Sequence, residues 1–353
     1  MSDRRIQLER RRISVDKVRV GVAGFGVIGQ RLADGVARQE DMQLVGVADV
    51  KPTLAVRALA ERGMPYELYA AIPEAVDQLG AGGIPVAGGF DDLLDNVDIM
   101  LDATSAGVGA ENKKRYVDRG LKAIFQGGES SDIADVFFHG YANYDKGVGE
   151  DYLKLTSCNT TGLIRAVDCL DRGVGVEKVA ITIIRRVADP GDTHRGIVDM
   201  LLMEPIPNHQ AVDLMLVMPH VAATGLLVHA PVTHGHIITI VATPKQKVTK
   251  DEMLDLFKAH PRIRVVKIED GFNSNTALFN YGRFLGHPRG DMYEIGIFEE
   301  TIGFSGDDIV LAINIPQESV VIPESMDAIR AALPMQSNRD EALALTNKFL
   351  GME

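Results

Sequence analysis

Over its first 170 residues the chain alternates between short apolar runs and segments in which apolar residues recur at helical spacing. Strands are predicted at 18–23, 42–48, 97–104, 122–128 and 151–156, and helices at 30–39, 110–119 and 163–170. Such alternation predicts parallel strands joined by helices, with ligands bound at the carboxyl ends of the strands. The first half is therefore expected to be a Rossmann-type, doubly wound parallel sheet.

From about residue 175 the pattern changes to longer apolar runs. These runs, at 179–184, 236–241, 294–298 and 309–315, predict the strands of a second, mostly antiparallel sheet. The predicted fold class is α/β, with the Rossmann-type sheet followed by an α+β catalytic domain.

Three units follow from this pattern. Residues 1–16 are expected to be a basic tail, 17–156 a nucleotide-binding domain, and 157–316 the catalytic domain. The segment 317–353 ends in a helical pattern and is expected to pack back on the nucleotide-binding domain. The arginines of the tail could contact an acidic partner, although such leaders are more often solvated.

A glycine motif joins the first predicted strand to the first predicted helix. Gly24, Gly26 and Gly29, with Val27 and Ile28 between the last two, form G-x-G-x-x-G. The first glycine permits a tight turn, the second lets the backbone approach a pyrophosphate, and the third lets helix and strand pack closely. The position of the motif between strand and helix favours dinucleotide binding over a simple glycine-rich turn.

Asp49 ends the second predicted strand, 20 residues after Gly29. At this place a carboxylate meets the adenosine ribose hydroxyls and repels a 2′-phosphate, so NAD is the expected cofactor. Lys51 could partly restore affinity for phosphate, which leaves NADP possible. The alternative is that Asp49 is a turn residue before Pro52.

Composition excludes several classes of protein. A net charge of −12, from 37 basic and 49 acidic residues, gives no electrostatic footprint for nucleic acid. No apolar run reaches the roughly 18 to 20 residues that cross a bilayer. Two cysteines cannot form a disulfide framework, which fits a reducing compartment. We therefore expect a cytoplasmic protein that binds neither nucleic acid nor membrane.

Cys158 lies in a run of small polar residues, 157–162, between a predicted strand and a predicted helix. The positive end of a helix favours thiolate over thiol, so Cys158 is a candidate nucleophile. The alternative is a small buried residue in a tight turn, because free cysteines are usually inert core residues. Its place directly after the parallel sheet puts the thiol at the cofactor cleft.

Six of the nine histidines lie between His194 and His236, which suggests a catalytic base or a metal site. His234 and His236 are predicted to share one face of a strand and, with His229, could chelate a metal. No cysteine or carboxylate completes a close ligand set. We therefore predict no metal, and a structural role is the stronger interpretation of His236.

Several of these motifs, in this order, resemble the archaeal-type (type II) glyceraldehyde-3-phosphate dehydrogenase family. The resemblance spans nearly all of the chain after residue 16. It rests on the segments 24–29, 123–129, 157–162, 185–190, 234–236, 269–271, 317–319 and 327–330.

The resemblance implies a phosphorylating aldehyde dehydrogenase. Cys158 would be the nucleophile and His234 the base, with an aldehyde and inorganic phosphate as substrates and a homotetramer as the assembly. The implied cofactor contacts are Gly128, Arg186 and Gln317, and the implied substrate contacts are Ser157, Asn159, Thr160, His209 and Gln210. Arg185 suits phosphate through its planar guanidinium, the alternative being a surface ion pair.

The departures from the family pattern concern specificity. The family has a lysine where this chain has Asp49, and its S-H-H-G-P-D stretch reads differently at 208–213. Its K-G-P-I-N segment is altered at 194–198, and its Q-E-S-D stretch at 317–320. Another phosphorylated or short polar aldehyde is therefore an alternative substrate. A second alternative is an NAD-binding regulatory protein that senses redox state without turnover.

Overall fold

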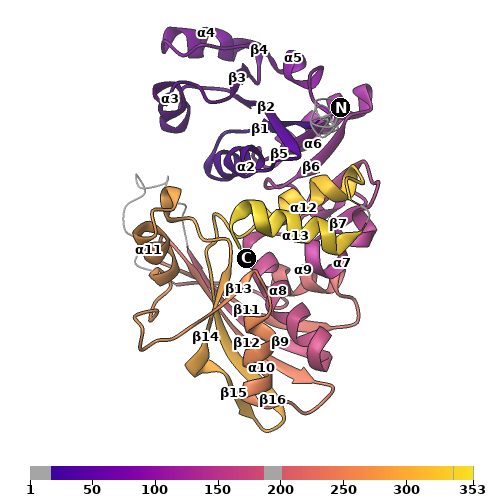
Figure 1. Ribbon diagram of the computed structural model, residues 1–353, viewed down its shortest axis with the longest axis vertical. Helices are drawn as coiled ribbons and strands as arrows, with labels where there is room; N and C mark the ends of the chain where they lie inside the picture. Colours follow the sequence, from indigo (N-terminus) through magenta and orange to yellow (C-terminus); the bar gives the residue numbers. More distant parts are fainter. Residues whose placement is uncertain (1–16, 187–200, 337, 353) are drawn as a thin grey trace, which may run out of the picture.

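The computed structural model describes residues 17–186, 201–336 and 338–352. The predicted basic tail, 1–16, and the altered segment 194–198 lie outside the described residues. None of the described helices is both long and apolar enough to cross a membrane. Figure 1 shows two sheets, one above the other, with the C-terminal helices between them.

The first sheet has eight parallel strands in the order β4-β3-β2-β1-β5-β6-β8-β7, which confirms the predicted Rossmann-type architecture. Its strands are β1 (Val18–Ala23), β2 (Met42–Asp49), β3 (Glu67–Ala70), β4 (Gly88–Gly89), β5 (Ile99–Asp102), β6 (Lys122–Phe125), β7 (Val136–Phe138) and β8 (Tyr152–Leu155). Its helices are α2 (Val27–Ala37), α3 (Leu54–Glu61), α4 (Pro73–Ala81), α5 (Phe90–Leu94), α6 (Val108–Arg119) and α7 (Gly140–Asn143).

Helices cover both faces of this sheet because its central strands are apolar on both sides. Val20 and Val22 of β1 belong to a core that includes Leu32 of α2, whereas Ala23 belongs to a second core with Tyr116 of α6. A strand that is buried on both faces reads as a continuous apolar run, as the sequence of β1 does.

The second sheet is mixed and follows the order β10-β11-β9-β12-β16-β14-β13, with β15 paired to β16. Most pairs are antiparallel, as predicted, but β9 with β11 and β13 with β14 are parallel. The strands are β9 (Val176–Arg186), β10 (Leu202–Glu204), β11 (Ala222–Ala230), β12 (His236–Pro244), β13 (Ile263–Val266), β14 (Ile295–Phe298), β15 (Gly303–Ser305) and β16 (Asp308–Ile315).

The described helices cover only one face of the second sheet. The central helix is α8 (Cys158–Val174), flanked by α9 (His209–Val217) and α10 (Lys250–Lys258), while α11 (Ala277–Phe284) lies near the strand ends. Apolar residues of the opposite face stay exposed: Ile184 on β9, Leu226 on β11 and Val241 on β12 have 38%, 39% and 36% of their surface accessible.

The C-terminal segment returns to the first domain as α12 (Ile322–Ala332) and α13 (Arg339–Leu350). Helix α12 packs against α2, β6 and β8, and in Figure 1 both helices lie in yellow between the two sheets. Arg330 of α12 donates hydrogen bonds to Asp41 and Gln39, which follow α2. Helix α12 therefore contacts the nucleotide-binding half.

A buried charge network joins α8 to α12. Arg165 of α8 donates to both carboxylate oxygens of Glu324 on α12, at 3.0 and 2.5 Å. Arg262, just before β13, donates to Glu324 at 3.0 Å and to Asp327 at 2.6 and 3.0 Å. Both arginines and both carboxylates are fully buried. Burial opposes ionisation of Glu324, but the two guanidinium groups outweigh it and lower its pKa to about 2.

We expect Glu324→Gln to lower the free energy of unfolding by about 3 to 5 kcal/mol, because it leaves the buried guanidinium of Arg165 without its carboxylate and leaves Arg262 with Asp327 alone. Urea unfolding measures this difference. The matched control is Glu111→Gln, which removes an exposed partner of Lys114 and should change stability by less than about 1 kcal/mol. Equal effects of the two substitutions would contradict a structural role for the buried network.

Candidate active site

A cleft of about 780 Å³ lies where the carboxyl ends of the first sheet meet the second domain. This volume lies in the range of sites that hold small molecules and cofactors. Its walls come from the glycine turn, the loops after β5 and β6, the start of α8, and the turn before α12. Predicted site residues among those that line it are Gly26, Val27, Ile28, Gly128, Ser157, Cys158, Arg186, His209 and Gln317.

The glycine turn is shaped to receive a phosphate. A Cβ on Gly29 would come within 1.8 Å of the Gly24 carbonyl oxygen, so only glycine permits this close approach of helix and strand. A Cβ on Gly26 would meet nothing within 4 Å and would instead project into open space at the cleft. No side chain caps the start of α2, so its first amide groups can donate to a pyrophosphate.

Asp49 lies at the carboxyl end of β2 and braces the glycine turn. Its Oδ2 accepts a hydrogen bond from the Phe25 amide at 2.9 Å, and its Oδ1 accepts one from the Val50 amide at 2.7 Å. Each carboxylate oxygen keeps acceptor capacity beyond this one bond. A negative charge is thus fixed beside the turn, at the place predicted for the ribose of the nucleotide.

Cys158 is the first residue of α8, it is half-buried, and it lines the cleft together with the glycine turn. Burial raises the pKa of its thiol. Arg185, Arg186 and the amide groups of Asn159 and Cys158 oppose this rise but do not overcome it. The amide groups at the helix start thus favour thiolate, but in the free protein desolvation outweighs them and the net shift of the pKa is upward.

Ser157 is the N-cap residue of α8, and its hydroxyl accepts a hydrogen bond from the Thr160 amide at 3.4 Å. The side chains of Asn159 and Thr160, predicted to contact substrate, are fully buried and do not line the cleft. Thr160 instead donates to Asp213 of α9 at 3.2 Å. These residues therefore hold the turn that presents Cys158.

His236 is buried against Asn159. Its Nδ1 lies 2.8 Å from Asn159 Oδ1, while its Nε2 has no partner among the described residues. Burial lowers the pKa of His236 well below its ordinary value, and Arg185 and Arg186 lower it further. A histidine that stays neutral here is suited to positioning Asn159 beside the thiol.

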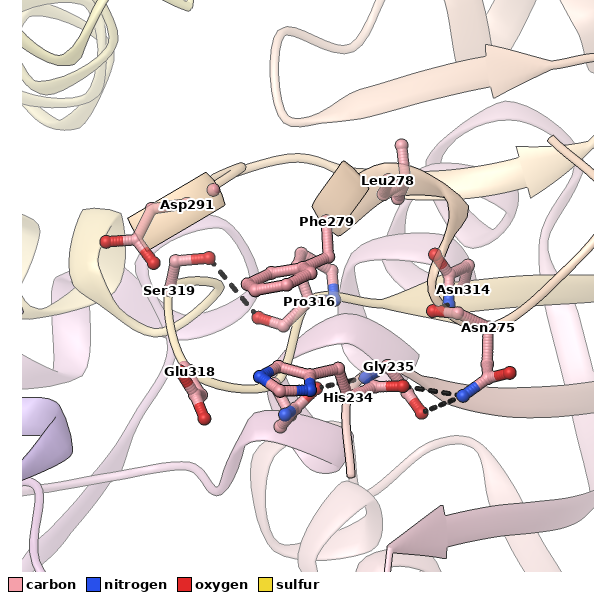
Figure 2. Close-up of a pocket in the computed structure, with 12 residues that line it drawn as sticks. His234, Gly235, Asn275, Leu278, Phe279, Asp291, Asn314, Pro316, Glu318 and Ser319 are labelled. Carbon is pink, nitrogen blue, oxygen red and sulfur yellow. Dashed lines mark hydrogen bonds between the residues drawn. The ribbon is translucent and has the colours of Figure 1, made fainter. Parts of the chain in front are cut away.

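His234 does not share a strand face with His236, contrary to prediction. Strand β12 begins only at His236, and Gly235 has φ +75°, which turns the chain between the two histidines. His234 lines a separate pocket beside Phe279, shown in Figure 2. A Cβ on Gly235 would lie 1.6 Å from the Asn275 carbonyl oxygen, so this turn requires glycine.

Gln317 connects this pocket with the cleft, since it lines both. Its Oε1 accepts a hydrogen bond from the Gly235 amide at 2.6 Å. The neighbouring Glu318 lies 2.6 Å from Arg31 of α2 and 3.3 Å from Arg186 of β9. The turn before α12 thus joins the nucleotide helix, the predicted cofactor residue Arg186 and the backbone between the two histidines.

Arg185 offers a buried donor without a partner. Its Nε is unpaired among the described residues, and no ion pair of Arg185 is found in that part of the chain. It pairs in register with His229 of β11, and its charge acts on both Cys158 and His236. The described residues therefore give Arg185 no surface ion pair, and Arg185 is not among the residues that line the cleft.

His209 and Gln210 begin α9. His209 lines the cleft, whereas Gln210 is buried behind it, with its Nε2 2.6 Å from His209 Nε2 and its Oε1 unpaired among the described residues. Glu204 lies 3.4 Å from His209 and 2.8 Å from His229. The described residues contain no group of three or more side chains arranged to hold a metal ion.

Lys154 is a cleft residue that sequence reasoning missed. It is only 6% exposed, and its Nζ donates to the Gly127 and Leu155 carbonyl oxygens at 3.1 Å each. Burial lowers its pKa to about 8, with partial compensation from Asp213 and Glu129. The sequence feature that could have indicated Lys154 is a charged residue inside an otherwise apolar predicted strand, four residues before Cys158.

The chain is similar to known proteins over nearly all of its length. Residues 157–276 match the family described as glyceraldehyde 3-phosphate dehydrogenase, C-terminal domain. A glyceraldehyde-3-phosphate dehydrogenase of Sulfolobus acidocaldarius is 40% identical, over 95% of this chain and 97% of its own length. The enzyme of the same name from Thermococcus kodakarensis is 39% identical, over 95% of this chain and 99% of its own length. The one from Methanothermus fervidus is 36% identical, over 94% of this chain and 98% of its own length.

Among solved structures, aspartate semialdehyde dehydrogenase II from Vibrio cholerae superposes with a TM-score of 0.62 at 12% identity. The similarity covers 90% of this chain and 98% of that one. At this level of identity the match establishes a shared fold and nothing more.

Proposed function

The chain belongs to the archaeal-type glyceraldehyde-3-phosphate dehydrogenase family, and from that membership we propose a phosphorylating enzyme that forms its thioester on Cys158. Its substrates are glyceraldehyde 3-phosphate and inorganic phosphate, and its product is 1,3-bisphosphoglycerate. The observation that carries this proposal is a thiol at the start of α8 that lines one cleft with a dinucleotide-type glycine turn.

The first step joins the thiol to the aldehyde. Because burial raises the pKa of Cys158, the free enzyme holds a thiol, and a base must remove its proton as sulfur attacks the carbonyl carbon. His234 is the proposed base. The half-buried position of His234 lets it exchange protons, whereas the fully buried His236 is held neutral. The product of this step is a hemithioacetal on Cys158.

Oxidation and phosphorolysis complete the cycle. A nicotinamide dinucleotide, when bound, would supply the acceptor for the hydride that leaves the hemithioacetal carbon. The proton of the hemithioacetal hydroxyl passes to His234 as the thioester forms. Gly26, Gly128, Arg186 and Gln317 would hold it along the cleft. The thioester that remains on Cys158 is cleaved by an oxygen of inorganic phosphate, which forms the acyl phosphate and releases the thiolate. Arg185 is proposed to hold a phosphate group through its guanidinium.

Activity with glyceraldehyde 3-phosphate tests this proposal directly. Reduction of NAD or NADP should require phosphate or arsenate, and Cys158→Ser should lower kcat by at least about a thousandfold. The matched control is Cys169→Ala. Cys169 is a buried core residue whose Sγ donates a hydrogen bond to the Leu256 carbonyl oxygen, so this variant should keep near-normal activity. No turnover with either cofactor would contradict the proposal.

Two other results of that assay would change the proposed reaction or the proposed substrate. Turnover without phosphate would indicate a non-phosphorylating enzyme. Turnover only of another phosphorylated or short polar aldehyde would support the alternative substrate, for which His209 is the candidate contact in the altered segment 208–213, because it lines the cleft.

The proposed cofactor is NAD, on the evidence of the carboxylate that Asp49 fixes beside the glycine turn. We expect Asp49→Lys to shift the ratio of kcat/KM values toward NADP by roughly tenfold or more, because a cation replaces the charge that repels a 2′-phosphate. Asp49→Asn should give an intermediate ratio, since it removes the charge but keeps the shape. Unchanged ratios in both variants would exclude Asp49 as the selector.

We propose a homotetramer, supported by the second sheet, in which Ile184, Leu226 and Val241 are exposed on the face opposite the described helices. A sheet with one bare apolar face is usually buried against another layer, and a second copy of the chain supplies one. Sedimentation at micromolar concentration measures the assembly, and a monomer would contradict the proposal.

The cytoplasm is the proposed location, because both cysteines are free, as expected in a reducing compartment. Cell fractionation tests this proposal.

A further inference from the structure

Phe279 of α11 is stacked on His234. The two ring centroids are 4.2 Å apart and the ring planes are inclined by 26°. The guanidinium carbon of Arg283, one turn further along α11, lies 4.1 Å from the centroid of the same phenyl ring. Figure 2 shows the phenyl ring beside the imidazole in the pocket that both residues line.

The imidazole and the guanidinium must lie on opposite faces of the phenyl ring, because two groups within about 4 Å of its centroid would collide on one face. The three side chains thus form a layered stack, His234–Phe279–Arg283. Arg283 is exposed, so the stack extends from the pocket to solvent.

The backbone on either side of the imidazole is already fixed. Asn275 Nδ2 donates to the His234 carbonyl oxygen at 2.6 Å, and Gln317 accepts from the Gly235 amide. The His234 Nδ1 lies 3.0 Å from Thr233 Oγ1. The remaining freedom of His234 is rotation of its side chain, and the phenyl ring lies where it limits that rotation.

We propose that Phe279, backed by Arg283, is a positioning residue that sets the plane of the His234 imidazole and keeps this imidazole in its neutral, proton-accepting form. The inference rests on the proposed role of His234 as the base. It adds a specific function for α11, a helix that contributes no residue to the lining of the cleft.

The charges around His234 act in the same direction as the stack. Burial lowers the pKa of His234, and Arg283, Arg186 and Arg31 lower it further, whereas Glu318 opposes them. A lowered pKa keeps the imidazole neutral to lower pH, so the enzyme retains its base under mildly acidic conditions. Loss of the phenyl ring would admit water and return the pKa toward its ordinary value of 6.5.

The test compares Phe279→Leu with Phe284→Leu, the same change on the same helix at a phenyl ring that is 88% exposed. NMR titration of His234 and the pH profile of kcat/KM are measured for both variants. In Phe279→Leu the titration and the acid limb of the profile should move together to higher pH, and kcat/KM below neutral pH should fall roughly tenfold. Phe284→Leu should match the wild type.

Two further variants separate the effect of the Phe279 ring on His234 from the effect of the Arg283 charge. Phe279→Tyr keeps an aromatic ring and should restore the wild-type profile. Arg283→Met should move the titration in the same direction as Phe279→Leu but less far, because the charge of an exposed side chain is screened by solvent.

An unchanged His234 titration in Phe279→Leu would overturn the inference. A titration that moves while the pH profile stays fixed would also overturn it, because the stack would then have no link to catalysis. The titration is measurable even in a protein without turnover. Failure of the proposed function is therefore a separate result from failure of the stack.

Discussion

The buried contact between Arg165 and Glu324 is the interaction on which the arrangement of the site depends. Arg165 lies two turns along the helix that starts with Cys158, and Glu324 lies in the first turn of α12. Arg262 and Asp327 complete a balanced set of charges without access to water. Because breaking one member leaves an uncompensated charge, the network fixes the thiol helix relative to the segment that carries Gln317 and Glu318.

A second link runs from the nucleotide half to the catalytic half. Arg31 of α2 is 4% exposed and pairs with both Asp291 and Glu318, while Glu318 also pairs with Arg186. The first turn of α2 binds phosphate in folds of this type, so the proposed cofactor contacts and the proposed base are connected by the same buried ion pairs. Desolvation in this frame raises the pKa of the thiol, which makes proton removal part of the chemistry of the proposed first step.

Features set by local sequence were predictable, whereas those set by packing were not. The strand, turn and helix around Gly26 follow from apolar period and glycine spacing, and the structure confirms them. The separation of His234 from His236 depends on the positive φ of Gly235 against Asn275, which no periodicity reveals. The raised pKa of Cys158 depends on how deeply the folded protein buries the thiol. The stack of His234 on Phe279 joins residues that are 45 positions apart in the sequence. Long-range contacts of this kind exist only after the chain has folded.

The return of α12 has a consequence for the order in which the protein is made. Gly35 of α2 lies directly under Ile322, where an added Cβ would come within 2.7 Å of its side chain. Part of the inner face of α2 is therefore covered by α12, a helix that follows it in the sequence by more than 280 residues. Until α12 has been synthesised, this part of the nucleotide-binding half stays exposed, and Arg165 lacks the carboxylate of Glu324. Both halves are therefore completed by a helix that is synthesised after them.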